Sequence, residues 1–127
     1  MKTPEDLKYS SDHEWIKAED ANKVRIGITD YAQDALGDIV FVELPEVGST
    51  VSVGQSISEV ESTKSVSDIY APVSGVVVEV NTDLDAEPER LNGDPYGEGW
   101  ICVIDVADQG SLDALMDAGA YVKLTEG

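Results

Sequence analysis

One lysine stands alone in the middle of the chain. Lys64 is the only basic residue between Arg25 and Arg90, although residues 26–89 contain thirteen Asp and Glu residues. Its neighbours Ser62, Thr63 and Ser65 are small and polar, so nothing beside it would bury an ammonium group. The segment therefore predicts an exposed turn that presents an amine. Such an amine either solvates the surface or, once deprotonated, forms a bond through its nitrogen.

The other residue types that commonly do chemistry are arranged poorly for it. His13-Glu14 lacks the second histidine of a zinc-protease helix, and one histidine cannot build a multi-histidine metal site. Cys102 lies in an apolar run, which favours a buried core thiol over a nucleophile. We therefore expect no metal site and no catalytic residues, and an independent enzyme is the least favoured interpretation.

Charge narrows the possible ligands. The 127 residues include 26 acidic and 8 basic ones, for a formal net charge of −18. Nucleic acid and anionic membrane surfaces are excluded as ligands because both require clustered Lys and Arg. The apolar runs are too short to cross a membrane, and the N-terminus has no apolar signal segment. We expect a cytoplasmic monomer that repels copies of itself and is steered toward basic partners.

The pattern around Lys64 is that of a small β-domain. Alternating and β-branched runs predict strands, and Lys64 lies midway between two of them; the strands are expected at 24–28, 39–44, 57–62, 66–70, 76–80 and 100–106. A short helix is expected at 31–36, after an N-cap at Thr29-Asp30 and before a C-terminal Gly37. An amphipathic helix is expected at about 111–123, with Leu112, Leu115, Met116 and Gly119 on one face.

Short strands with Gly and Pro turns indicate a mainly β fold, a small barrel or sandwich decorated by helices. Residues 1–127 show no linker and no internal repeat, which predicts a single domain. The long connection at 81–99 is of the kind that is often functional. Its end, 95–100, either faces a partner or packs Trp100 into the core, and packing is favoured.

Several long segments resemble the H proteins of the glycine cleavage system. They are His13-Glu14-Trp15, Gly27 to Val40, Val42 to Gly48, Glu61 to Gly75 and Asn92 to Trp100, spread over roughly residues 8–122. Glu61 and Gly75, three residues before Lys64 and eleven after it, are typical of lipoyl attachment turns. Biotin carriers usually flank their lysine with methionines, whereas Thr63 and Ser65 flank Lys64. The resemblance therefore implies covalent lipoate on Lys64.

The fold that this resemblance implies is a barrel-sandwich hybrid lipoyl domain. Its lipoyl core would span about 24–106, and a C-terminal amphipathic helix would follow. The implied function is that of a non-catalytic shuttle. It would take the aminomethyl group of glycine from a pyridoxal-phosphate glycine decarboxylase to a tetrahydrofolate-dependent aminomethyltransferase. Dihydrolipoyl dehydrogenase would then reoxidise the arm, which a lipoate ligase or lipoyl transferase attaches.

The resemblance also suggests how a loaded arm would be protected. It would fold back onto the protein, where a carboxylate holds its amine as a cation and water is excluded. Glu14 and Asp68 match positions implicated in these contacts, although with 26 acidic residues ordinary surface acidity is an equal alternative. The chain departs from some relatives at Asp12, where they have serine, and at Ala35, where they have histidine.

Two further hypotheses remain beside the glycine-cleavage shuttle. A related carrier could relay lipoyl groups to other enzymes without serving glycine oxidation. An unmodified interaction domain could instead dock partners through its acidic surface. Replacing Lys64 by Arg separates the last hypothesis from the other two, because docking alone would survive the change.

Overall fold

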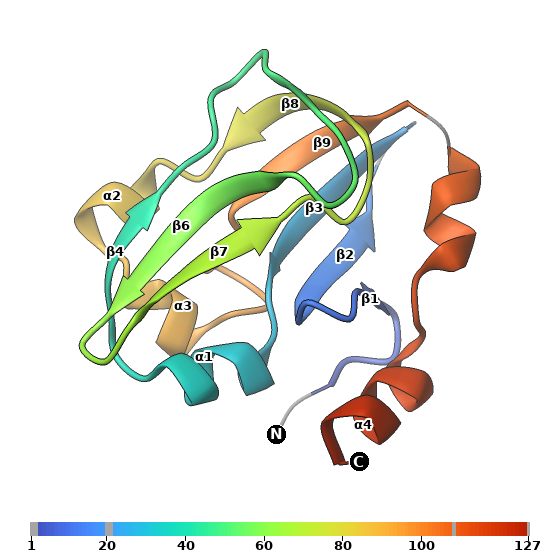
Figure 1. Cartoon of the computed structure of the whole chain (residues 1–127). Coiled ribbons are helices and arrows are strands. Elements are labelled where there is room, and N and C mark those ends of the chain that lie inside the picture. The colour runs from blue at the N-terminus through green and yellow to red at the C-terminus, as the bar shows by residue number, and fades with distance from the viewer. Residues whose placement is uncertain (1–2, 20–21, 108, 127) are drawn as a thin grey trace.

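The computed structural model describes residues 3–19, 22–107 and 109–126. Two antiparallel sheets carry the fold, and Figure 1 shows them facing each other with short helices at their ends. The larger sheet has the strand order β1-β2-β3-β9-β8-β5, and the smaller has the order β4-β6-β7. The nine strands described are β1 (Lys8–Tyr9), β2 (Glu14–Ala18), β3 (Lys23–Ile28), β4 (Ile39–Glu43), β5 (Thr50–Val51), β6 (Ser56–Ser62), β7 (Val66–Tyr70), β8 (Gly75–Val80) and β9 (Cys102–Val106).

Among the described residues, three α-helices lie between the strands, and a 3₁₀ segment and a fourth α-helix follow the last strand. They are α1 (Asp30–Leu36), α2 (Asp83–Ala86), α3 (Arg90–Gly93), the 3₁₀ segment η1 (Gln109–Ala114) and α4 (Ala118–Glu126). The mainly β architecture and the short helix between Thr29-Asp30 and Gly37 are confirmed, with Thr29 as the N-cap. The connection at 81–99 contains α2 and α3, which the sequence pattern did not predict. The strand expected at 100–106 begins at Cys102.

The predicted helix at 111–123 is wrong in its extent. Met116 leaves helical geometry because its backbone pairs with Tyr9 in both directions, at 2.8 Å each. The apolar residues that suggested one helical face divide between two cores. Leu112 and Leu115 pack against the main core, whereas Met116 packs against a second cluster. The C-terminal helix therefore begins at Ala118.

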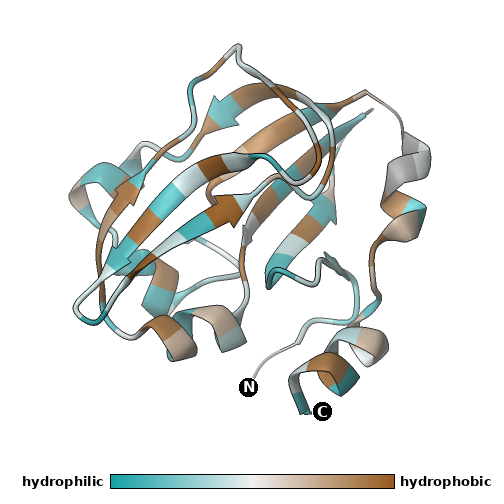
Figure 2. Ribbon diagram, in the orientation of Figure 1, coloured by the Kyte–Doolittle hydropathy of each residue, from teal (hydrophilic) through white to brown (hydrophobic). Residues whose placement is uncertain are grey.

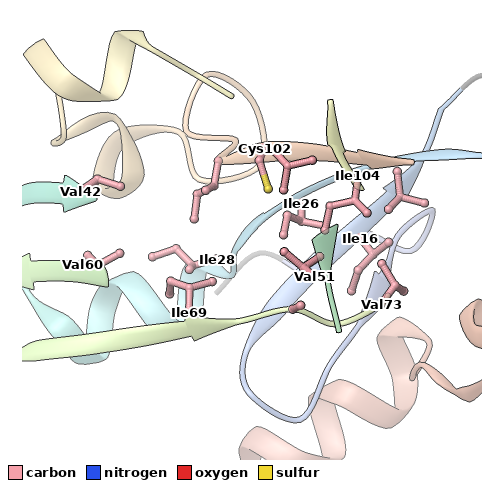
Figure 3. Close-up of a cluster of buried hydrophobic side chains, with 14 of the residues drawn as sticks. Ile16, Ile26, Ile28, Val42, Val51, Val60, Ile69, Val73, Cys102 and Ile104 are labelled. Carbon is pink, nitrogen blue, oxygen red and sulfur yellow. The ribbon is translucent and has the colours of Figure 1, made fainter. Parts of the chain in front are cut away.

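The main core lies between the two sheets, and Figure 3 shows its side chains converging from both. Alternation along the strands supplies it: Val42 and Val60 point inward from the small sheet, and Ile26 and Ile104 from the large one. Figure 2 shows this alternation as bands of opposite hydropathy along β6. Burying these core side chains contributes about 25 cal/mol of free energy per Å² of apolar surface, and this is the main interaction that holds the two sheets together.

The second cluster covers the N-terminal strands. Tyr9 and Trp15 are fully buried beneath α4, where Tyr9 stacks on Tyr121 with ring centroids 4.7 Å apart. The loop at 94–100 closes the same region, because Trp15 Nε1 donates a 2.8 Å hydrogen bond to the carbonyl of Pro95. Arg25 lies 4.4 Å above the ring of Trp100. These contacts agree with the packing alternative for this loop.

Gly75 allows β8 and β9 to pair at close range. A Cβ placed there would lie 2.1 Å from the backbone oxygen of Asp105, which cannot move without breaking the ladder. We expect Gly75→Ala to lower the free energy of unfolding by about 3 kcal/mol. Gly93→Ala is the control, since a Cβ there meets nothing within 4 Å. Urea unfolding of the two variants measures the difference, and equal stabilities would contradict the prediction.

Candidate functional site

Ser62 organises the turn that carries Lys64. The Ser62 Oγ accepts hydrogen bonds from the backbone N–H groups of Lys64, at 3.2 Å, and of Ser65, at 3.1 Å. The backbone N–H of Ser62 donates to the carbonyl of Ser65 at 2.8 Å, which closes the turn between β6 and β7. The small polar residues predicted to form an exposed turn therefore do so by bonding to one another.

The turn is also fixed from outside the hairpin. The N–H of Thr63 donates to the carbonyl of Asp38 at 3.0 Å, which joins the turn to the start of β4. Figure 1 shows the hairpin turn lying next to the end of α1, which precedes this segment in the chain. The turn that carries Lys64 is therefore held both by the β6–β7 hairpin and by the segment that leads into β4.

The Lys64 side chain is exposed and lies along Gly37. Within the described part of the chain it forms no ion pair. A Cβ on Gly37 would lie 3.0 Å from Lys64 Cε. The absence of a side chain at Gly37 therefore leaves space for the aliphatic part of the lysine. Gly37 has a φ of +86°, a backbone conformation in which glycine is favoured. The amine is accessible, and its aliphatic stem is supported.

A cleft opens where α1 ends. It has a volume of about 320 Å³ and lies between α1, β7 and the segment before β2. Tyr31, Ala35 and Leu36 line it from α1, and Leu36 immediately precedes the glycine beside Lys64. Its remaining lining residues are Asp12, His13, Ile28, Ala32, Ser67, Asp68 and Ile69. A group attached to Lys64 therefore has a neighbouring hollow that is partly apolar.

Three elements meet at one wall of this cleft. His13 Nδ1 shares a 2.8 Å hydrogen bond with the hydroxyl of Tyr121, and Tyr31 lies 4.8 Å from the histidine ring. The Tyr121 hydroxyl also bonds Thr29 Oγ1 at 2.7 Å, and Thr29 caps α1 by accepting from the N–H of Ala32. Burial lowers the pKa of His13. The C-terminal helix thereby positions both a cleft residue and the start of α1.

Glu14 is buried just behind the cleft. One carboxylate oxygen accepts from Ser10 Oγ at 2.7 Å, and the other accepts from the backbone N–H of Tyr70 at 3.1 Å. Burial raises the pKa of Glu14 to about 7, and these two hydrogen bonds act in the opposite direction. The side chain thus joins β2 to β7, and its carboxyl group exchanges a proton near neutral pH.

Asp68 lies at the cleft but turns its carboxylate elsewhere. It lines the hollow, yet its Oδ1 accepts a 3.3 Å hydrogen bond from Ser56 Oγ. The carboxylate of Glu14 contacts β7 at the backbone of Tyr70, two residues beyond Asp68. Asp12 and Ala35 both line the cleft.

Sequence reasoning missed Tyr121 and Tyr31 as parts of the site. No local signal could have shown Tyr121, because its partner His13 lies 108 residues away. Tyr31 follows the predicted N-cap, and only the packing of α1 turns it toward His13. Cys102 is buried as predicted, and burial raises the pKa of its thiol to about 12.

Other kinds of site are not found among residues 3–19, 22–107 and 109–126. That part of the chain contains no group of three or more His, Cys, Asp and Glu side chains placed to hold a metal ion. Nor does it contain a helix long and apolar enough to cross a membrane.

Two sheets that enclose a core and present a lysine at a hairpin turn define a barrel-sandwich hybrid of the lipoyl type. A solved structure with this arrangement, a glycine cleavage system H protein from Mycobacterium marinum, superposes with a TM-score of 0.88. The two sequences are 46% identical, and the match covers 98% of this chain and 99% of the other.

Sequence comparisons agree. The family model for the glycine cleavage H-protein matches residues 7–127, so the chain belongs to that family. It is 59% identical over 121 residues to a glycine cleavage system H protein of Coprothermobacter proteolyticus, covering 95% of each chain. It is also 59% identical over 123 residues to one of Micrococcus luteus, covering 96% of each.

The raised pKa of Glu14 predicts how stability changes with pH. The folded protein holds this proton up to about pH 7, whereas the unfolded chain releases it near 4.5. Stability from this group is therefore present at low pH and is lost as pH rises through that window, by about 3 kcal/mol in all. Glu14→Gln keeps the shape and removes the titration.

We expect the difference in unfolding free energy between the Glu14→Gln variant and wild type to grow in favour of the variant from pH 4.5 to 7. Urea unfolding at several pH values measures it. Glu79→Gln, at an exposed position on β8, is the control for the lost unit of charge. A pH profile parallel to wild type in the Glu14 variant would contradict the prediction.

Proposed function

We propose that this protein is the lipoyl carrier of a glycine cleavage system and that lipoate is attached to Lys64. The observation that carries the proposal is the lysine itself. Its amine is exposed, and its stem lies in a space that a Cβ on Gly37 would fill. The turn beneath it is held by Ser62 and Asp38. Family membership and the structure from M. marinum support the same role.

Attachment at Lys64 is an acyl transfer. The amine of Lys64, after losing a proton to the attaching enzyme, attacks the carbonyl of an activated lipoyl group. A C–N bond forms, and the bond between the acyl carbon and its activating group breaks, so no oxidant or reductant is needed. The amide removes the only positive charge in residues 26–89. The attaching enzyme would be a lipoate ligase or a lipoyl transferase.

Lipoate on Lys64 would supply a disulfide. The carbon of glycine that keeps the bonding electrons when CO2 leaves would bond to one sulfur, the S–S bond would break, and the other sulfur would take up a proton. The partners that this role requires are glycine decarboxylase, the aminomethyltransferase and dihydrolipoyl dehydrogenase. The chain itself would be a non-catalytic carrier and a monomer. The relatives named above come from bacteria, which supports a bacterial cytoplasmic setting.

The cleft beside α1 would shelter the end of the arm. It begins next to Gly37, so the arm need only follow the lysine stem to enter it. Asp68 lines the hollow, and Glu14 lies behind its wall. We propose that both contact the loaded arm. The Asp68 carboxylate would leave Ser56 Oγ to reach the amine of the arm, and the Glu14 carboxylate would act from behind the cleft wall. His13 and Tyr31 would shield that end from water.

Intact mass tests the attachment. After co-expression with a lipoate ligase and added lipoate, the wild-type chain should gain one lipoyl group, and Lys64→Arg should gain none. Lys123→Arg, at an exposed position of α4, should gain the group as wild type does. No gain in wild type, under conditions that modify a known lipoyl domain, would refute the assignment and leave the acidic interaction domain as the leading hypothesis.

Reconstitution tests the pathway. The lipoylated protein should support glycine decarboxylation with the three enzymes named above, and Lys64→Arg should lower the rate at least about 10³-fold, to background. A protein that accepts lipoate and passes it to other enzymes, yet fails to support glycine turnover, would be the relay instead. A Lys64→Arg variant with full function would indicate docking alone.

A further inference from the structure

Large apolar side chains are exposed immediately beside the lysine turn. Val40 and Phe41 of β4 are 53% and 46% exposed, and Val66 at the start of β7 is 57% exposed. Val66 is two residues from Lys64, which places it within about 7 Å along the chain. We name these three residues the docking patch. Exposed residues of this size, gathered at one place, mark contact with another molecule more often than single ones do.

Strand register places two of the three residues on one face. Phe41 pairs with Glu61, and Glu61 pairs with Val66, so these side chains stand in one row across the three strands. A register shift between Ile39 and Phe41 inserts Val40 as an extra residue, and both Val40 and Phe41 consequently point outward. The bulge therefore enlarges the apolar surface at the end of β4.

The patch faces away from the core. The next row, Val42 and Val60, is buried, which fixes the opposite face of the sheet as the inner one. Ser67 and Ile69, which line the cleft, alternate with Val66 along β7 and belong to the inner side. The hairpin thus offers a hollow on one face and an apolar patch on the other, with Lys64 at the end between them. Asp68 lies at the edge of both, because it lines the hollow while its carboxylate bonds Ser56 on the outer face.

Acidic residues border the patch. The row beyond Phe41 and Val66 consists of Glu43, Glu59 and Asp68, which pair across the same three strands. With Glu61 inside the patch, the side of the patch that faces away from the turn is negative. A partner that fits must bring an apolar contact surrounded by basic side chains.

We propose that the docking patch binds the enzyme that acylates Lys64. This inference rests on the proposed attachment of lipoate. Such an enzyme must bring its activated acyl group to the lysine nitrogen itself, so its surface has to cover the turn and the strand ends beside it. The enzymes that act on the far end of an attached arm work at a greater distance and need not cover Val66 or Phe41.

A double variant tests the proposal. Phe41→Thr with Val66→Thr removes the apolar contact while retaining good strand formers. Val76→Thr with Val78→Thr is the matched control, because both valines are exposed on β8 of the other sheet. Initial rates of lipoyl attachment by purified lipoate ligase are measured against carrier concentration. We expect the patch variant to raise KM about tenfold with kcat nearly unchanged, and the control to match wild type.

The same variants distinguish a failure of the proposed docking patch from a failure of the proposed lipoyl attachment. Prolonged incubation with excess ligase gives fully lipoylated variants, whose glycine turnover should equal that of wild type. An unchanged KM in the patch variant, or an equal rise in the control, overturns the proposal. Loss of glycine turnover with normal attachment also overturns it, since the patch would then serve another partner. If wild type itself gains no lipoyl group, the proposed function fails instead.

Val66→Thr alone provides a second variant that leaves β4 unchanged, and urea unfolding verifies that each variant remains folded. The single variant should raise KM several-fold. The KM of wild type should also rise with added salt, because the acidic border attracts the partner at a distance. A KM that is independent of salt contradicts the charged border as part of the contact.

Discussion

The side chain of Asn92 holds together the segment on which the lysine turn rests. Its Oδ1 accepts from the N–H of Ile39, and its Nδ2 donates to the carbonyl of Gly37 and to Gln33 Oε1, each at 2.9 Å. One amide therefore ties α3 to the end of α1 and to the start of β4. Asp38 lies between Gly37 and Ile39, and its carbonyl accepts a hydrogen bond from the N–H of Thr63 in the turn. A short helix far along the chain thus fixes the base of the arm.

A rigid base matters because the working part of a carrier is flexible. Lys64 has a long side chain that makes no ion pair within the described residues, whereas the turn beneath it is bonded internally and to β4. Motion is thereby confined to the lysine and to whatever it carries. The two faces of the hairpin then offer different environments, a partly apolar cleft beside α1 and an exposed apolar patch bordered by carboxylates.

The C-terminal helix completes the site from the other end of the chain. Tyr121 brings the histidine of the cleft wall and the N-cap of α1 to one hydroxyl group, and it stacks on Tyr9 in the second core. Behind that wall, the buried Glu14 links β2 to β7. The packing that stabilises the N-terminal strands therefore also sets the shape of the cleft.

Much of the local structure could be predicted because its causes are local. Thr29 and Gly37 bound α1 through bonds made within a few residues, and the serines around Lys64 form a turn by bonding one another. The alternating strands and the buried Cys102 follow from hydrophobic periodicity in the same way. Family resemblance added the chemistry of the lysine, which a lone exposed lysine could not have shown.

The sequence by itself therefore determined the strands β3, β4 and β6 to β9, the position of the first helix, and that Lys64 stands exposed between two strands. It did not reveal β1 and β5, which have two residues each, or β2, in the polar N-terminal segment. Only the tertiary structure decided what surrounds the lysine. The apolar spacing at 111–123 predicted one helix, but the pairing of Met116 with Tyr9 interrupted it, because two backbone hydrogen bonds and two separate cores compete with helical periodicity. The contacts of Tyr121 with His13 and of Asn92 with Ile39 join residues far apart in the chain, and no local pattern encodes such contacts.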